Sequence, residues 1–126
     1  MSSPAISVAM SVYNGERFLA PAIESILAQT FTDFETIVID NASRDGSAEA
    51  VEVAFPEVTV VRNAHNLGFG RAANQAAELA TGDYLLLLNP DGYVEPGSLD
   101  ALVAFAQRNP QYVIVGGRTI SPEGDL

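Results

Sequence analysis

The stretch ISVAMSVYNGERFLAPAIESILAQ, residues 6–29, carries the pattern that decides the fold. Its first eight residues (6–13) form a nearly continuous apolar run, which is typical of a strand buried on both faces. From residue 17 to residue 29 the apolar side chains recur instead at the three- and four-residue spacing of one helical face. The segment therefore predicts a buried strand that leads directly into an amphipathic helix.

The same two periods alternate along the rest of the chain. Further apolar or β-branched runs predict strands at 34–40, 58–63, 84–89 and 112–117. Helical spacing predicts helices at 47–55, 69–80 and 98–108, with Ser98 as the N-cap of the last and Gly82 in the C-cap position of the helix 69–80. This order predicts an α/β fold with a mostly parallel sheet, β-α-β connections and helices on both faces.

Length and composition limit the class of protein. The chain has 126 residues, which suits a single domain, and 48% of them are hydrophobic, which is enough for a core. No apolar run approaches the roughly 20 residues of a membrane span, and the N-terminus does not resemble a signal peptide. The absence of cysteine excludes disulfides and thiolate metal sites. We expect a soluble, cytoplasmic protein.

The formal net charge is −10, and all six basic residues are arginine. They are scattered along the chain and form no basic stripe, so we expect no nucleic-acid partner. These arginines are Arg17, Arg44, Arg62, Arg71, Arg108 and Arg118. The acidity fits either simple solubility or carboxylates that share a divalent cation, and charge alone does not choose between them.

Polar residues follow four of the predicted strands at the points where the strands end. These junctions are residues 12–15, 40–43, 63–68 and 89–91. The carboxyl ends of parallel strands meet at one edge of the sheet, and ligands of such sheets bind there. The sequence therefore predicts a ligand site built from these four junctions.

The junction after the strand 84–89 reads Asn89-Pro90-Asp91-Gly92. Pro90 holds the residue before it extended and donates no backbone hydrogen bond, so the strand ends sharply. A carboxylate and an amide oxygen at that point suit Mg²⁺ or Mn²⁺. Because the same four residue types are the commonest turn formers, an ordinary turn also accounts for this stretch taken alone.

Asp40 ends the second predicted strand and opens the sequence DNASRDGS. A carboxylate there can accept a hydrogen bond from a nucleobase or a ribose hydroxyl, or it can form an Asx turn into the next helix. Both interpretations are compatible with the residues that follow it.

The stretch from Gly68 to Ala73 matches the dinucleotide fingerprint G-x-G-x-x-G/A. However, residues 64–67 separate it from its strand, and it lies at the third strand–helix turn instead of the first. Gly68 and Gly70 are explained more simply by a tight turn into a helix whose N-terminus faces a phosphate. The only histidine, His65, is interpreted as a solvated loop residue.

Three segments taken together resemble the family-2 glycosyltransferases with the GT-A, Rossmann-like fold. They are SVYNGERFLAPAIESILAQTF (11–31), ETIVIDNASRDGS (35–47) and RNAHNLGFGRAANQAAELATGDYLLLLNPDGYVEPGSL (62–99). The motifs DNAS-x-DGS, NLGF and LLNPD are similar to those of the rhamnosyltransferase-like members. The similarity covers the chain from about Ile6 to Gly117.

This resemblance implies an inverting enzyme that transfers a sugar from a UDP- or dTDP-linked donor to an acceptor hydroxyl, assisted by Mg²⁺ or Mn²⁺. It implies Asp91 as the metal ligand. Asn89 stands where the family usually has a carboxylate, which implies a weak metal site or one that depends on the nucleotide. The implied nucleotide-binding residues are Ser11, Val12, Tyr13, Asn14, Asp40, Asn41, Asn66, Gly68, Arg71, Asn74 and Asn89.

The family's members are about twice as long as this chain. The resemblance therefore implies that residues 1–126 are a single domain, the N-terminal donor-binding part of a truncated enzyme. The catalytic base and most of the acceptor site are then expected beyond Leu126. The implied setting is cell-envelope polysaccharide synthesis, with a glycan or lipid-linked acceptor and a cytoplasmic full-length enzyme lying peripheral to the membrane.

Two alternatives stay open on the sequence. A sugar-1-phosphate nucleotidyltransferase shares the broad architecture, but SVYNGERF lacks the glycine-rich basic loop that such enzymes have after the first strand. The other alternative is a truncated domain that only binds a nucleotide or self-associates. A shortened sheet leaves an edge exposed, through which a homo-oligomer can form.

Overall fold

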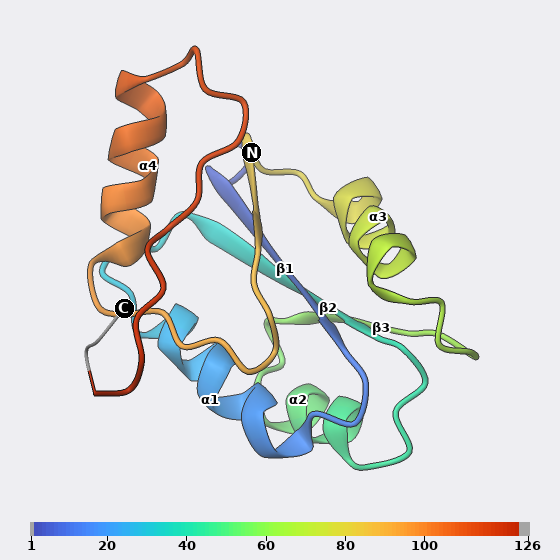
Figure 1. The fold of residues 1–126 in the computed structure, drawn as a ribbon. Helices are drawn as coiled ribbons and strands as arrows, with labels where there is room; N and C mark the ends of the chain where they lie inside the picture. The colour runs from blue at the N-terminus through green and yellow to red at the C-terminus, as the bar shows by residue number, and fades with distance from the viewer. Residues whose placement is uncertain (1, 124–126) are drawn as a thin grey trace.

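A computed structural model describes residues 2–123 of the chain (Figure 1). The elements in chain order are β1 (Ile6–Val12), α1 (Glu16–Leu27), β2 (Phe34–Asp40), α2 (Ser47–Ala54), β3 (Thr59–Arg62), α3 (Phe69–Leu79), β4 (Tyr84–Leu87) and α4 (Ser98–Arg108). The four strands form one parallel sheet in the order β3-β2-β1-β4. The predicted α/β class with β-α-β connections is confirmed.

The order of the strands reverses beside β1. The chain moves outward from β1 to β2 and β3, and then returns to the other side of β1 as β4. In open α/β sheets, a reversal of this kind is where ligands bind.

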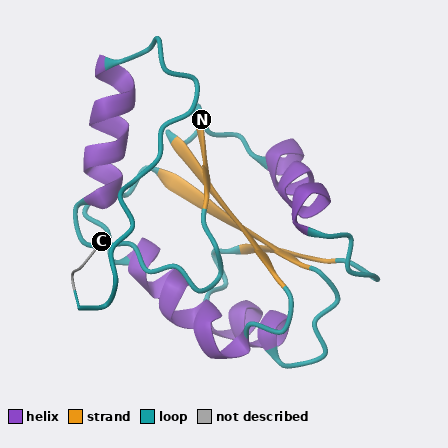
Figure 2. Ribbon diagram, in the orientation of Figure 1, coloured by secondary structure: helices purple, strands orange, loops and turns teal. Residues whose placement is uncertain are grey.

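Helices cover both faces of the sheet, as predicted (Figure 2). On one face, α1, α2 and α4 pack on alternate side chains of β1, namely Ile6, Val8, Met10 and Val12. On the other face, α3 contributes Ala72 and Ala76, which pack on Ala9, Ile37 and Ile39. Both faces are therefore held mainly by burial of apolar surface.

β4 departs from the prediction of a buried strand. Leu86 and Leu88 pack against the main core, but Leu85 and Leu87, which point to the other face, are 43% and 50% exposed. Within residues 2–123, β4 is an edge strand that pairs only with β1, and α3 lies mainly over β1 and β2. The run of four leucines is consequently anchored through one of its two faces.

The prediction of a strand at 112–117 is wrong. These residues form an irregular segment, and Val113 and Ile114 are 97% and 90% exposed. The segment lines an apolar groove of about 400 Å³ together with β4 and α4. A strand needs a hydrogen-bonded neighbour, and no strand of the described chain pairs with this segment.

Two helix-capping residues in the structure also differ from those predicted. Ser98 is the first residue of α4, and the N-cap is Gly97, whose φ of 82° is left-handed. The C-cap of α3 is Ala80. Gly82 serves close packing instead, because a Cβ atom on it would lie 2.6 Å from the backbone nitrogen of Ser7.

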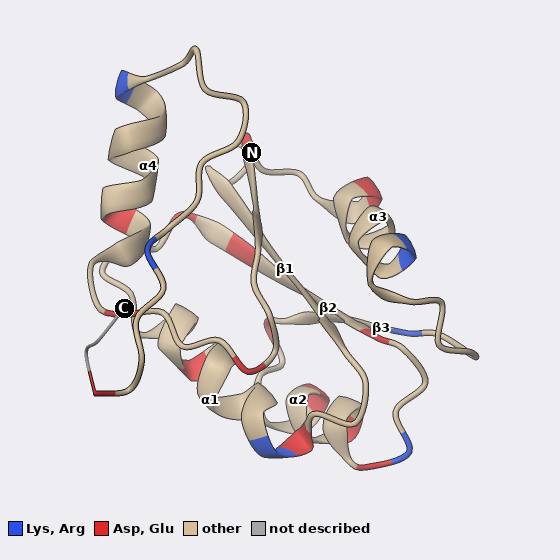
Figure 3. Cartoon of the chain, in the orientation of Figure 1, with Lys and Arg blue, Asp and Glu red and all other residues tan. Residues whose placement is uncertain are grey.

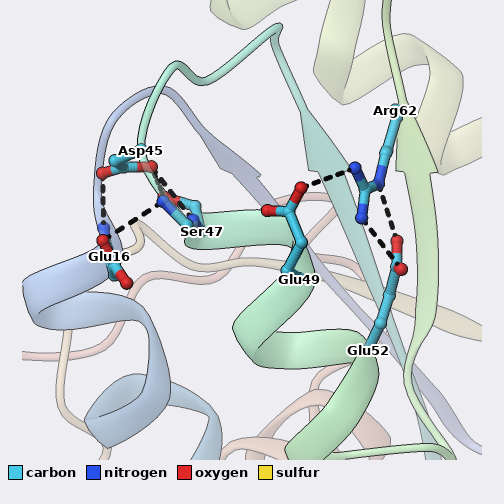
Figure 4. A network of polar contacts seen from close by, with 7 residues as sticks. Glu16, Asp45, Ser47, Glu49, Glu52 and Arg62 are labelled. Carbon is cyan, nitrogen blue, oxygen red and sulfur yellow. Dashed lines mark hydrogen bonds and ion pairs between the residues drawn. The ribbon is translucent and has the colours of Figure 1, made fainter.

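The arginines are scattered over the described part of the fold, as Figure 3 shows. Arg62 of β3 lies 3.0 Å from Glu49 and 2.8 Å from Glu52, both on α2, so this arginine fastens a helix to the edge of the sheet (Figure 4). The hydrogen bonds that the Arg62 guanidinium donates to Glu52 and Glu49 raise the pKa of Arg62 above its usual range. Among the described residues, no helix is both long and apolar enough to cross a membrane.

Candidate functional site

The structure brings the first, second and fourth predicted junctions together at the carboxyl edge, and hydrogen bonds of Asn41 join the third junction to the second. A Cβ atom built on Gly15, after β1, would lie 4.0 Å from the Cβ atom of Pro90, after β4. Asp40 pairs with Val12 at the end of the β1–β2 ladder, and the Asn41 N–H donates to the Val12 carbonyl at 2.8 Å. The ends of β1, β2 and β4 therefore adjoin, as the sequence predicted.

The residues that end β1 face three different surroundings. Val12 belongs to the core and offers only its backbone. Ser11 is partly buried and lines a small hollow between β1 and α3, together with Phe69 and Leu87. Tyr13 is 49% exposed at the edge itself. Ser11 and Tyr13 are thus two side chains at the end of β1 that a ligand can reach.

Asp40 is a buried carboxylate with an unused oxygen. The residue is 4% exposed, and its Oδ1 atom has no hydrogen-bond partner among the described residues. The Thr36 hydroxyl oxygen is the only other buried side-chain nitrogen or oxygen atom in residues 2–123 that has no hydrogen-bond partner, and it lies in the middle of β2. Buried polar groups are normally paired, so the free oxygen of Asp40 fits a donor group supplied by a ligand.

Reciprocal hydrogen bonds join the loops that follow β1 and β2. The Asn14 N–H donates to the Ser43 hydroxyl at 2.9 Å, and the Asn14 side-chain oxygen accepts from the Arg44 N–H at 2.7 Å. Asn14 has a φ of 52°, in the left-handed region that asparagine tolerates better than most residues. Asn14 therefore uses its polar groups to hold the loop in shape.

A second set of bonds joins the starts of α1 and α2 (Figure 4). The Glu16 N–H donates to Asp45 Oδ2 at 3.1 Å, and the Gly46 N–H donates to Glu16 Oε2 at 3.1 Å. Asp45 also accepts from the hydroxyl and the N–H of Ser47. The Ser47 hydroxyl, followed by these backbone N–H groups, lowers the pKa of Asp45, whose carboxylate accepts a hydrogen bond from the first N–H group of each helix.

Asn41 connects the second and third junctions. It is 4% exposed, its Nδ2 donates to the Gly68 carbonyl at 3.2 Å, and its Oδ1 accepts from Asn63 Nδ2 at 2.9 Å. Asn63 in turn exchanges two hydrogen bonds with Gln75 of α3, at 2.7 and 2.8 Å. The sequence analysis placed Asn63 in the third junction but missed Gln75, because an amide pair that spans a loop and a helix has no characteristic spacing.

The loop before α3 is shaped by a local turn. The Asn66 side-chain oxygen accepts from the Gly68 N–H at 2.9 Å, which closes an Asx turn. Gly68 has φ 85° and ψ 168°, a conformation open essentially only to glycine, so the predicted tight turn is confirmed there. Gly70 lies within α3 and needs no such conformation. His65 is exposed, as expected of a solvated loop residue.

Arg71 and Asn74 lie in the first turns of α3 and are both exposed. Within residues 2–123, neither side chain takes part in a hydrogen bond or an ion pair. A guanidinium group and an amide group on this helix are therefore available to an anionic ligand.

Residues 89–92 form the predicted turn, closed by a hydrogen bond of 2.9 Å from the Gly92 N–H to the Asn89 carbonyl. The side chains of Asn89 and Asp91 are exposed and have no partner in the described structure. No group of three or more His, Cys, Asp or Glu residues among residues 2–123 could hold a metal. One free carboxylate beside one amide fits Mg²⁺ or Mn²⁺, which complete their shells with water and substrate phosphates.

The chain is similar to known glycosyltransferases along nearly its whole length. The family described as Glycosyl transferase family 2 matches residues 7–126. EpsE of Bacillus subtilis is 35% identical over 119 residues, which is 91% of this chain and 43% of EpsE. Glycosyltransferase GlyG of Streptococcus pneumoniae is 29% identical over 126 residues, which is 98% of this chain and 42% of GlyG. The chain thus spans less than half the length of these curated relatives.

Solved structures share the fold. S. aureus TarS 1-349, in complex with UDP-GlcNAc, superposes with a TM-score of 0.77 at 27% identity over 83% of this chain and 32% of that chain. The mannosyltransferase PcManGT from Pyrobaculum calidifontis, in complex with GDP-Man and Mn²⁺, has a TM-score of 0.76 at 24% identity, over 97% of this chain and 37% of that chain. At 24% identity, the similarity to PcManGT shows a shared fold alone.

Proposed function

This chain belongs to glycosyl transferase family 2, and we propose that it forms the donor-binding part of an inverting glycosyltransferase that uses a UDP- or dTDP-linked sugar. The observation that carries the proposal is the buried carboxylate of Asp40 at the carboxyl edge, with its Oδ1 atom unpartnered among the described residues. An ionised carboxylate only accepts hydrogen bonds, and the ring N–H of uracil or thymine is a matching donor.

The remaining contacts follow from which side chains are free. The ring of Tyr13 is exposed beside Asp40's strand end and offers a surface on which a base can stack. Ser11 offers a hydroxyl, and Val12 offers its backbone. Arg71 and Asn74 on α3 are proposed to bind the diphosphate, because a guanidinium forms paired, charge-assisted hydrogen bonds with phosphate oxygens.

Four other residues expected from the resemblance have a supporting part in this proposal. The polar groups of Asn14, Asn41 and Asn66 already make hydrogen bonds within the protein, and Gly68 supplies the turn before α3. We propose that they hold the loops that surround the nucleotide, while Asp40 and the side chains of α3 contact it.

We propose that Asp91, with Asn89, binds Mg²⁺ or Mn²⁺ together with the donor diphosphate. One free carboxylate is a weak site by itself, so metal binding should depend on the phosphate oxygens. A bound divalent cation offsets the negative charge that grows on the leaving diphosphate. In this proposal, the side chains of Asp91 and Asn89 hold the diphosphate end of the donor at the 89–92 turn.

The activity of the whole protein is a wider proposal. The motifs DNAS-x-DGS, NLGF and LLNPD favour a rhamnosyltransferase-like donor and a glycan or lipid-linked acceptor in cell-envelope polysaccharide synthesis, at the cytoplasmic side. The relatives are more than twice as long as this chain. We therefore propose that transfer needs a base and an acceptor site outside residues 1–126.

A second candidate function is self-association through β4. Leu85 and Leu87 are 43% and 50% exposed on an edge strand, and the apolar groove beside them continues to the exposed Val113 and Ile114. Unpaired sheet edges with apolar side chains favour pairing with another chain.

Calorimetric titration of UDP and dTDP, with Mn²⁺ and then with EDTA, tests the donor site. We expect micromolar binding that weakens when the metal is removed. In the presence of Mn²⁺, the Asp91→Ala variant should bind each nucleotide with the affinity that the unchanged chain shows in EDTA. Glu57→Gln, an exposed acid at the amino edge of the sheet, is the control and should not change binding. An unchanged chain that binds neither nucleotide under either condition would contradict the proposal.

A further inference from the structure

Two buried polar side chains of the α1 region hold the segment that follows Asp91. Ser25 and Gln29 are 4% and 5% exposed, although the neighbouring residues on this face of α1 are apolar. The Ser25 hydroxyl donates to the Ala22 carbonyl at 2.7 Å and accepts from the Val94 N–H at 3.0 Å. A serine that only filled the core would need no partner outside its own helix.

Gln29 makes the larger share of the contacts with this segment. Its Nε2 lies 3.2 Å from the Val94 carbonyl, 3.0 Å from the Glu95 carbonyl and 3.1 Å from the Ser25 carbonyl. Its Oε1 accepts from the Leu99 N–H at 3.2 Å, at the start of α4. One buried amide therefore satisfies backbone groups on both sides of Gly97.

The turn that carries Asp91 is consequently fixed at both ends. At its start, the Leu88 N–H donates to the Ala9 carbonyl at 3.0 Å, which extends the ladder between β4 and β1. At its end, Val94 is held by Ser25 and Gln29. Asp91 lies three residues from each anchor, and three extended residues span at most roughly 10 Å. The position of each anchor therefore limits where Asp91 can lie.

We propose that Ser25 and Gln29 are positioning residues, which fix the 89–92 turn and thereby hold Asp91 where it meets the metal and the donor diphosphate. The metal part of this inference rests on the proposed function. The two residues touch neither ligand, and they act through the backbone of residues 94–99. Burying these two polar side chains costs desolvation free energy, and their hydrogen bonds to the backbone of residues 94–99 offset that cost.

Three variants separate positioning from simple loss of stability. Ser25→Ala and Gln29→Leu remove the hydrogen bonds to residues 94–99. Ile23→Val is the matched control, because Ile23 is fully buried on the same helix and makes no contact of this kind. It removes one buried methyl group, and so lowers the unfolding free energy, without touching the anchor.

The first readout is the ratio of the UDP dissociation constants in EDTA and in Mn²⁺. Residues that orient metal ligands from outside are typically worth about 10- to 100-fold in metal affinity. We expect the ratio to fall about tenfold in Ser25→Ala and Gln29→Leu, with the constant in EDTA unchanged. Ile23→Val should leave both constants unchanged. An unchanged ratio in both anchor variants, or an equal fall in Ile23→Val, overturns the inference.

The second readout needs no nucleotide. Amide hydrogen exchange of residues 91–93 should be faster in Ser25→Ala and Gln29→Leu than in Ile23→Val, while β1 and β2 exchange equally in all three. If the unchanged chain binds no nucleotide, the proposed function fails, and this exchange measurement alone decides whether Ser25 and Gln29 fix the turn. Equal exchange at residues 91–93 in all variants overturns the inference.

Discussion

The side-chain oxygen of Asn14 accepts a hydrogen bond from the Arg44 N–H at 2.7 Å, and this bond ties the loop after β1 to the loop after β2. Residues 30 positions apart in the sequence thereby fix the edge of the proposed nucleotide site. Because Asn14 also has a φ of 52°, its side chain serves both the bond and the backbone conformation.

Asn14→Ala should lower the unfolding free energy by about 1–2 kcal/mol, since it loses one hydrogen bond and places alanine in the left-handed region. Asn14→Gly loses the same bond but accepts the backbone conformation, so its loss should be smaller. Urea denaturation of the three proteins measures both effects. A glycine variant less stable than the alanine variant would show that the positive φ contributes nothing.

Asp40→Asn should bind UDP at least about tenfold more weakly, because a charge-assisted hydrogen bond is worth roughly 1.5–3 kcal/mol. In the absence of nucleotide, the variant should be as stable as the unchanged chain or more stable, since it removes a buried charge whose Oδ1 atom has no described partner. Titration and urea denaturation on the same samples measure the two quantities. A large loss of stability would mean that the carboxylate serves the fold instead of a ligand.

Gly82→Ala should lower the unfolding free energy by about 1–3 kcal/mol, the usual cost of forcing an extra carbon into a packed site. The added Cβ atom would lie 2.6 Å from the Ser7 nitrogen and 2.7 Å from the Ile6 carbonyl carbon, and backbone atoms of a central strand do not move easily. Gly116→Ala is the control, because nothing lies within 4 Å of a Cβ atom there. Equal stability of the two variants would contradict this account of Gly82.

Glu35 should make the stability of the chain depend on pH in the acid range. Burial raises the pKa of Glu35, but hydrogen bonds from the Ser7 hydroxyl and from the N–H and hydroxyl of Thr81 outweigh it, and the pKa is lowered in the folded chain. The resulting stabilisation is complete above the unfolded pKa of about 4.3 and is lost as the pH falls through the lower, folded value.

Glu35→Gln should therefore be less stable than the unchanged chain at neutral pH, and the difference should shrink as the pH falls below about 4.3. Thermal unfolding at a series of pH values measures this difference. The comparison variant Glu57→Gln changes an exposed side chain that makes no hydrogen bond in the described structure. A Glu35→Gln difference that stays constant with pH would contradict the expected linkage.

Leu85→Lys and Val113→Lys should reduce the self-association of residues 1–126, because a charge on an open sheet edge opposes pairing with a second chain. Sedimentation velocity at several protein concentrations measures the change. Val53→Lys is the matched control, since Val53 is 84% exposed on α2, away from the β4 edge. If the unchanged chain is monomeric at all concentrations, self-association through β4 is excluded.

The order and type of the eight elements follow from the amino-acid sequence alone. Apolar runs and helical spacing act over a few residues, so they predict Phe34–Asp40 as a strand and Ser98–Arg108 as a helix without reference to the rest of the chain. The sequence also places Asp40 at the end of one strand and Asp91 just after another, at one edge, because strands in a parallel sheet share their direction. The turn at Gly68 followed from glycine's access to positive φ.

Only the tertiary structure decided which strand lies at the edge and which contacts hold the site. Leu85 and Leu87 match a buried strand in composition, yet they are exposed because β4 lies at the edge of the described sheet. Gly82 is required by Ser7, 75 residues earlier, and Gln29 reaches Leu99, 70 residues later. Such pairs have no local periodicity, since side chains so distant in sequence meet only after the sheet and helices have packed.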